Sequence, residues 1–193
     1  MKKNQKTQKI QFKRKVEGRT NYRKRLKLIA SYKPRLVVRK TSRNIIAQII
    51  EFNPKGDHVI SSAYSKELQK LGWKFSRNNL PAAYLTGLLC GAKAMKKNIK
   101  EAILDIGLNT PINRSIIYAV LKGALDSNLK IPHSKEVLPD EKRISGEHIV
   151  AYSSLLKNNE IYKKQFSQYL KQGVKPEDIT KYIKEIKEKI LKK

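Results

Sequence analysis

Positive charge is concentrated at one end of this 193-residue chain. Residues 1–43 contain 17 Lys or Arg and one acid, Glu17, whereas the other 150 residues contain 26 bases and 15 acids, so +16 of the +27 net charge lies in under a quarter of the length. Self-repulsion limits how much of this segment can join a compact core. We therefore expect a basic arm, residues 1–33, that binds a polyanion; a solvated tail is the alternative.

Apolar and aromatic side chains are interleaved with the arginines of the arm, which is not typical of a low-complexity tail. Tyr22, Leu26 and Ile29 recur at helical spacing after Thr20, a candidate N-cap. We expect a short amphipathic helix whose apolar stripe docks on the core, leaving guanidinium groups to bind phosphates and stack on unpaired bases. Residues 1–18 have too little apolar surface to order alone, and we expect them to fold on the partner.

The core, residues 34–133, opens with a predicted antiparallel meander of three strands. The β-rich runs 35–40, 44–52 and 58–64 are separated by the polar turn 41–43 and by a break at 53–57 that contains Pro and Gly. Basic side chains of the first hairpin are continuous in sequence with the arm and are candidates to extend its binding surface. Cations that merely protect an edge strand are the alternative.

Alternating helices and strands follow the meander. Apolar periodicity predicts helices over 81–98 and 115–125, with strands over 101–108 and 130–132. We expect Gly87 and Gly91, one turn apart, to permit close approach of the first helix to the sheet. The fold class is therefore α/β, with a mixed sheet made from an antiparallel meander plus a βαβαβ unit whose later strands are parallel.

The last segment, residues 134–193, has the composition of a helical C-terminal extension. After Pro176, Ile179, Ile183, Ile186 and Ile190 lie on one side of a predicted helix. The pattern leaves open whether that side packs on this chain or on a neighbour.

Several classes of function are disfavoured. A single cysteine, Cys90, gives no internal disulfide or cysteine-based zinc site, and the three histidines are too far apart for a local metal motif. The longest apolar run, 80–92, is too short to span a membrane, and no signal segment follows the first residues, so we expect a cytoplasmic protein with no membrane partner. No cofactor or small-molecule motif is present.

A metal-dependent nuclease of the ribonuclease H class is the alternative to a binding protein, because that fold also begins with a meander. The chemistry needs several clustered carboxylates, one of them normally on the first strand. Residues 35–40 offer none, and Asp105 and Asp126 have no evident third partner. We therefore expect no catalysis, and interpret Asp105 as a buried or capping acid and His133 as a structural or RNA-contacting residue.

Ordered sequence blocks from Phe12 to Ile149 resemble the archaeal branch of the L-eighteen family of large-subunit ribosomal proteins. The blocks are Gly18-Arg19-Thr20-Asn21-Tyr22-Arg23-Lys24-Arg25-Leu26, Lys33-Pro34-Arg35-Leu36-Val37-Val38-Arg39-Lys40, Ala47-Gln48, Gly72-Trp73, Leu80-Pro81-Ala82-Ala83-Tyr84-Leu85-Thr86-Gly87, Leu104-Asp105-Ile106-Gly107-Leu108 and Ile131-Pro132-His133.

This resemblance implies a non-catalytic ribosomal protein that binds 5S ribosomal RNA and helps attach it to the large subunit at the central protuberance. It implies contacts with the large 23S-type ribosomal RNA and with neighbouring ribosomal proteins, and a core of the translational-machinery type, distantly like ribonuclease H. Carried over residue by residue, it assigns RNA binding to Arg14, Arg19, Tyr22, Arg23, Arg25, Arg35, Arg39, Lys40, Ser42 and Arg43. To these the prediction adds Lys13, Lys27, Asn44, which stands where many relatives have histidine, and Trp73 as a stacking residue.

Overall fold

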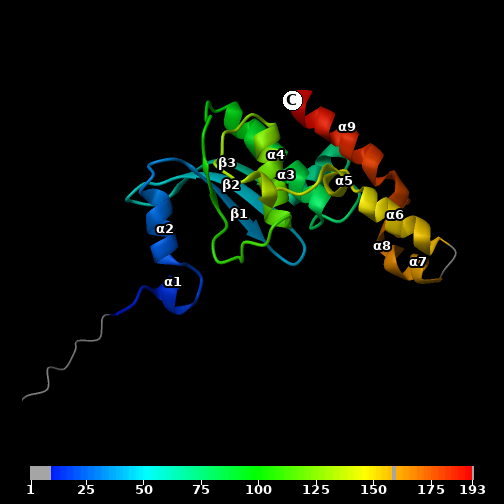
Figure 1. Ribbon diagram of the computed structural model, residues 1–193, viewed down its shortest axis with the longest axis horizontal. Helices are drawn as coiled ribbons and strands as arrows, with labels where there is room; N and C mark the ends of the chain where they lie inside the picture. The colour runs from blue at the N-terminus through cyan, green and yellow to red at the C-terminus, as the bar shows by residue number, and fades with distance from the viewer. Residues whose placement is uncertain (1–9, 158–159, 193) are drawn as a thin grey trace, which may run out of the picture.

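One four-stranded sheet lies between a basic arm at one end of the molecule and the C-terminal helices at the other (Figure 1). This computed structural model describes residues 10–157 and 160–192. The strand order is β3-β2-β1-β4, with bounds Arg35–Lys40 for β1, Ile45–Glu51 for β2, His58–Tyr64 for β3 and Ile103–Asp105 for β4. The α/β class and the mixed sheet are confirmed.

The predicted meander forms the larger part of the sheet. β1 pairs with β2 and β2 with β3, both antiparallel, with a register shift at Ile49/Ile50. The backbone N–H of Thr41 donates to the carbonyl of Asn44 at 2.8 Å and closes the first hairpin. Alternate residues of β2, Ile45, Ala47 and Ile49, are fully buried against the helices.

The later part of the sheet is smaller than the sequence predicts. β4 pairs in parallel with β1, as expected for a crossover, but it is only three residues long because the chain turns at Gly107, where φ is +63°. The strand predicted over 130–132 is reduced to a single parallel bridge between Glu101 and Lys130. Pro132 cannot donate a backbone hydrogen bond to extend that bridge.

The helices α3 (Leu80–Met95) and α4 (Ile116–Asp126) pack against each other through glycine. A Cβ on Gly87 would lie 2.0 Å from the carbonyl oxygen of Val120, and one on Gly123 would lie 2.0 Å from that of Tyr84. A Cβ on Gly91 would clash with the Ser127 side chain. The prediction that Gly87 and Gly91 face the sheet is therefore wrong: they allow close contact with α4.

The C-terminal extension is helical and packs on its own chain. It begins with the 3₁₀ turn η2 (Lys135–Val137) and continues through α5 (Glu141–Ile144), α6 (Glu147–Leu156), α7 (Glu160–Gln165), α8 (Ser167–Lys171), η3 (Pro176–Asp178) and α9 (Ile179–Lys192). The four isoleucines of α9 are at most 5% exposed and join the main core, where α9 packs against α3. The open question of their partner is thereby answered.

The arm contains two short helices, α1 (Lys13–Val16) and α2 (Tyr22–Ile29). Asn21, not Thr20, is the N-cap of α2, and its side chain accepts a hydrogen bond from the Lys24 backbone. Residues 10–18, predicted to order only on a partner, already include a helical turn, whereas residues 1–9 lie outside the described residues. The 3₁₀ helix η1 (Ser65–Leu71) connects β3 to the loop before α3. Over the described ranges, no helix is long and apolar enough to cross a membrane.

Candidate nucleic-acid interface

The two arm helices are folded onto each other by local contacts. Arg14 donates from Nε to the Thr20 hydroxyl at 3.0 Å, and the rings of Phe12 and Tyr22 lie 5.0 Å apart between centroids. Phe12 is nevertheless 70% exposed. The arm thus presents an aromatic pair beside its cations, the combination on which unpaired bases stack.

A chain of ion pairs joins the arm to the sheet. Arg25 of α2 and Arg35 of β1 both contact the carboxylate of Asp57, at 2.9 and 2.7 Å. Arg35 also contacts Asp105 at 2.8 Å, and Asp105 lies 3.6 Å from the Arg39 guanidinium. We call these five residues the arginine–aspartate network. It holds three cations near each other by placing two carboxylates between them.

A second ion pair fixes the end of the arm. Lys33 lies 2.6 Å from Glu101, where the chain enters β4. The hydrogen bond from the Lys33 ammonium, followed by its charge, lowers the pKa of Glu101. Both partners are about half exposed, so the pair positions the chain more than it stabilises the fold.

Asp105 and Arg35 occupy the buried centre of the arginine–aspartate network. Their side chains are 8% and 4% exposed, and the second Asp105 oxygen accepts from the Gly107 backbone at 2.8 Å. The interpretation of Asp105 as a buried acid is confirmed. The assignment of Arg35 to RNA contact is wrong, because its guanidinium is enclosed and already bound by two carboxylates; its role is to support the arm.

The apolar stripe of α2 does not dock as predicted. Leu26 is 69% exposed, while Leu28 and Arg25 line the side that faces the sheet. Between arm and sheet lies a hollow of about 520 Å³, whose lining combines basic side chains of the arm and β1 with apolar residues of the sheet and of the segment after β4. The ion pair between Arg25 and Asp57 therefore joins α2 to the sheet, together with the half-buried Leu28 and Ile29.

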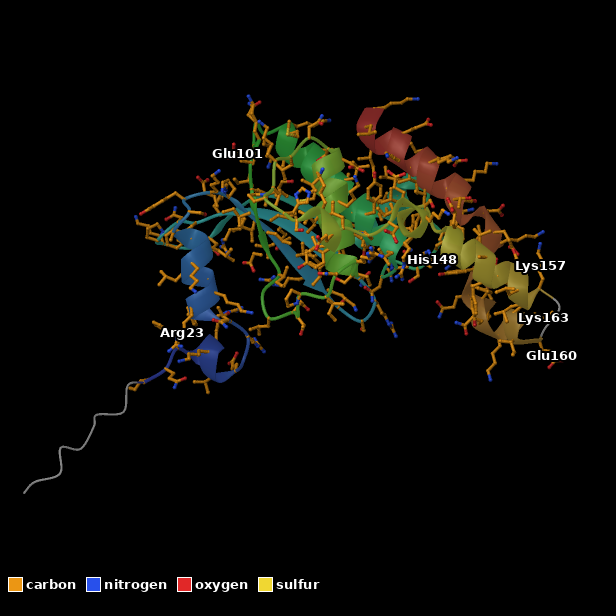
Figure 2. The ribbon with its side chains drawn as sticks, in the orientation of Figure 1. Arg23, Glu101, His148, Lys157, Glu160 and Lys163 are labelled. Carbon is orange, nitrogen blue, oxygen red and sulfur yellow. The ribbon has the colours of Figure 1, made fainter. Side chains whose placement is uncertain are left out.

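The outward side of the arm and of the first hairpin carries cations without an ion pair within the described residues. Arg23 projects from the arm at the end of the molecule opposite the part of the C-terminal extension that carries Lys157 and Lys163 (Figure 2). Of the predicted residues, this group includes Lys13, Arg23, Lys40 and Arg43, whereas Lys27 is also exposed and without an ion pair in the described chain but lines the hollow between arm and sheet. They are the side chains best placed to meet phosphates, because no carboxylate of the described residues has to be released first.

Two further residues predicted to bind RNA already contact other groups of the chain. Arg19 lies 3.2 Å from Glu17, but its side chain is 67% exposed and such a surface pair is weak. Arg39 donates to the carbonyls of Val38 and Asp105, yet its side chain remains 44% exposed. Both can still present a guanidinium edge to a ligand.

Trp73 does not belong to the interface. It is 1% exposed, its indole N–H donates to the Ser76 carbonyl at 3.0 Å, and its ring packs edge-on to Phe75. The prediction that Trp73 stacks on RNA is therefore wrong: it is a core residue.

The predicted hairpin residues lie at the far end of β1 from the arm. Ser42 and Arg43 are exposed in the turn, while Asn44 is half-buried and its backbone closes that turn. β1 is six residues long, so about 20 Å separate this group from the start of the strand. The predicted set therefore forms two surfaces.

The acidic residues do not form a metal site. No group of three or more His, Cys, Asp or Glu side chains in the described part of the chain could hold a metal ion. Asp126, the other candidate acid, accepts from the Tyr84 hydroxyl at 2.7 Å and pairs with Lys122. The hydrogen-bonded, buried Tyr84 has a raised pKa, mainly because of desolvation. His133 lies on the surface and its ring contacts the Ile131 carbonyl at 2.7 Å, so a structural and an RNA-contacting role both stay predictions.

A basic α/β core with an ordered cationic arm, and no clustered carboxylates among its described residues, defines a binding protein for a polyanion. Residues 6–101 match the family model described as ribosomal large subunit proteins 60S L5 and 50S L18. Over 183 residues the chain is 51% identical to large ribosomal subunit protein uL18 of Methanococcus maripaludis, covering 94% of this chain and 95% of that protein. The chain belongs to this family of large-subunit ribosomal proteins.

Family membership decides several of the predictions. The chain is a structural component of the large ribosomal subunit, acts in translation within the cytoplasmic ribosome, and is not an enzyme. Its partners are ribosomal RNA and other ribosomal proteins. The ribonuclease H-like nuclease considered as an alternative is thereby rejected.

Proposed function

We propose that this protein binds 5S ribosomal RNA through its arm and helps attach that RNA to the large subunit at the central protuberance. The arginine–aspartate network carries the proposal, because it holds the arm against the sheet while Lys13, Arg23 and Lys27 have no ion pair in the part of the chain that the structure describes. The core, which we assign to the translational-machinery type distantly like ribonuclease H, serves as a rigid base for the arm.

The mechanism combines phosphate neutralisation with stacking. Lys13, Arg23 and Lys27 neutralise phosphates, and the Phe12–Tyr22 pair stacks on an exposed base or sugar. Because the arm is already folded, binding costs less ordering entropy than it would for a disordered segment. Specificity comes from matching the shape of a folded RNA to this fixed arrangement of charge.

Salt dependence tests the electrostatic part of the mechanism. If about six phosphates are neutralised, the logarithm of affinity should fall with the logarithm of salt concentration with a slope of about −4 to −5. Filter binding of the full chain to transcribed 5S RNA measures this slope. A flat response would contradict the mechanism.

Charge-removing substitutions test the arm. We expect K13Q/R23Q/K27Q to weaken 5S RNA binding at least about tenfold and to reduce the slope by about 2, since these cations have no ion pair to lose. The matched control K175Q/K181Q/K184Q removes equal charge from the exposed surface of the C-terminal extension. Equal weakening by both triples would indicate that only net charge matters and would reject the arm assignment.

Deletion of residues 1–33 provides the complementary test. We expect a folded body, shown by circular dichroism, that no longer retains 5S RNA. Full RNA binding by that folded body would refute the proposal.

A further inference from the structure

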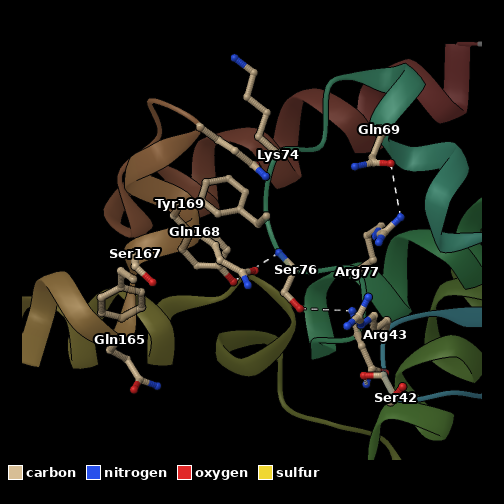
Figure 3. Close-up of a pocket in the computed structure, with 14 residues that line it drawn as sticks. Ser42, Arg43, Gln69, Lys74, Ser76, Arg77, Gln165, Ser167, Gln168 and Tyr169 are labelled. Carbon is tan, nitrogen blue, oxygen red and sulfur yellow. Dashed lines mark hydrogen bonds between the residues drawn. The ribbon is translucent and has the colours of Figure 1, made fainter.

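The C-terminal extension and the core enclose a polar cleft of about 680 Å³ at the far end of the sheet from the arm. Its walls come from the β1–β2 turn, from the loop 74–78 and from the region around α8. Figure 3 shows Arg43 and Arg77 on one side of the cleft, Gln168 and Tyr169 on the other, and Ser76 between them.

The chemistry of the lining is suited to an anionic strand. Three cations, Arg43, Lys74 and Arg77, line the cleft, and no Asp or Glu occurs among the described residues that do so. Amides and hydroxyls supply the remaining polar groups, from Ser42, Gln69, Ser76, Asn78, Gln165, Ser167, Gln168, Tyr169 and Gln172. Guanidinium and ammonium groups meet phosphates, and neutral amides read sugar hydroxyls and base edges.

The cations of the cleft are available to bind a ligand. Neither Arg43 nor Lys74 has an ion pair within the described residues, and Arg77 makes only a long hydrogen bond, 3.5 Å, to Gln69. Arg43 and Lys74 are exposed. A phosphate can therefore bind all three without displacing a carboxylate of the described chain, unlike at Arg35.

The loop between the two walls is held in place before any ligand binds. The Asn78 side-chain amide donates to the Ser42 carbonyl at 3.0 Å, and the Ser76 backbone N–H donates to the Tyr169 hydroxyl at 3.3 Å. Desolvation is the main cause of the raised pKa of that tyrosine. Phe75 packs edge-on to the same ring, with centroids 5.3 Å apart. Such fixation lowers the entropic cost of binding.

We propose that this cleft binds a second RNA segment, an unpaired or looped strand, independently of the segment bound by the arm. The inference rests on the proposed RNA-binding function and extends it to a surface formed jointly by core and extension. A folded protein segment is the competing occupant, but three uncommitted cations without a carboxylate favour a polyanion over an average protein surface.

The test compares three full-length triple variants with transcribed 5S RNA and, separately, with the transcribed large ribosomal RNA. They are R43Q/K74Q/R77Q in the cleft, K13Q/R23Q/K27Q in the arm, and K175Q/K181Q/K184Q on the surface of the extension as the matched control. We expect the cleft variant to bind at least one of the two RNAs about tenfold more weakly than the control, with a salt slope reduced by about 2. Which RNA is affected identifies the source of the segment.

The outcomes separate the two proposals. If the cleft variant matches the control with both RNAs, the cleft proposal is overturned whatever the arm variant does. If the arm variant matches the control with 5S RNA, the proposed function fails independently of the cleft. As a second measurement, a photoreactive residue in place of Gln168, in assembled large subunits, should cross-link to RNA; a cross-link to protein alone, or none, would overturn the inference.

Discussion

Asp57 is the residue on which the position of the arm depends, and its replacement by Asn gives the sharpest test of the structure. The carboxylate contacts Arg25 at 2.9 Å and Arg35 at 2.7 Å. Breaking a buried ion pair by removing one partner costs about 3–5 kcal/mol. Asp57 is 26% exposed and Arg35 keeps Asp105, so we expect D57N to lower the free energy of unfolding by about 2 kcal/mol.

Urea unfolding followed by circular dichroism measures that loss. With a slope of about 2 kcal/mol per molar urea, the midpoint should fall by about 1 M. The control is E188Q, because Glu188 pairs with Lys192 at 3.9 Å on an exposed surface and should change stability by less than about 0.5 kcal/mol. Equal midpoints for D57N and wild type would refute the structural role of the network.

The RNA affinity of D57N gives a test that is independent of stability, because two explanations predict changes in opposite directions. Removing a negative charge should tighten binding to RNA if only electrostatic attraction matters. If the orientation of the arm matters, loss of the Arg25 contact should instead weaken binding by about two- to fivefold, equivalent to about 0.5–1 kcal/mol. Tighter binding would refute our account of the network as a positioning device.

Four further outcomes are expected. W73F should lower stability by about 1–2 kcal/mol in urea unfolding while leaving RNA affinity within about twofold of wild type, since Trp73 lies in the core. G87A should lower the thermal midpoint by several degrees or prevent folding, and an unchanged midpoint would contradict the contact with Val120. I183A should cost about 2–5 kcal/mol in the same urea assay if α9 is part of the core. Burial raises the pKa of the Cys90 thiol from 9.0 to about 11, so its contribution to stability is constant below pH 9 and is lost as pH rises through 11; thiol labelling of native protein at pH 8 should be slow.

Strand positions were predictable because the meander repeats hydrophobic residues between clear turn signals. The runs 35–40 and 58–64 match β1 and β3, and 44–52 exceeds β2 by one residue at each end. The last strand was not predictable, because three residues ending in proline carry the right composition but too few backbone donors to form a ladder. The glycines of α3 correctly predicted that another element packs closely against this helix. The sequence could not specify that the element is α4 and not the sheet.

The site was predictable in its charge and not in its contacts. Exposed cations such as Arg23 and Arg43 follow from composition alone, whereas the burial of Arg35 depends on Asp57 and Asp105, which are 22 and 70 residues away in sequence. The sequence showed Asp57 only as an acidic residue in a predicted turn and did not indicate its arginine partners. Lys74 and Arg77 were missed because the cleft that they line exists only once the C-terminal extension folds back on the core.

The two aspartates of the network also restrict the direction from which a nucleic acid can approach. If a phosphate displaced Asp57 or Asp105 from its arginine, the carboxylate would lose its ion pair and remain next to the phosphate. The two anions would then repel each other. We therefore expect nucleic-acid backbones to avoid the seam between arm and sheet and to lie along its outer margin. The few acidic residues of this chain would thus help to exclude the nucleic acid from the seam between arm and sheet.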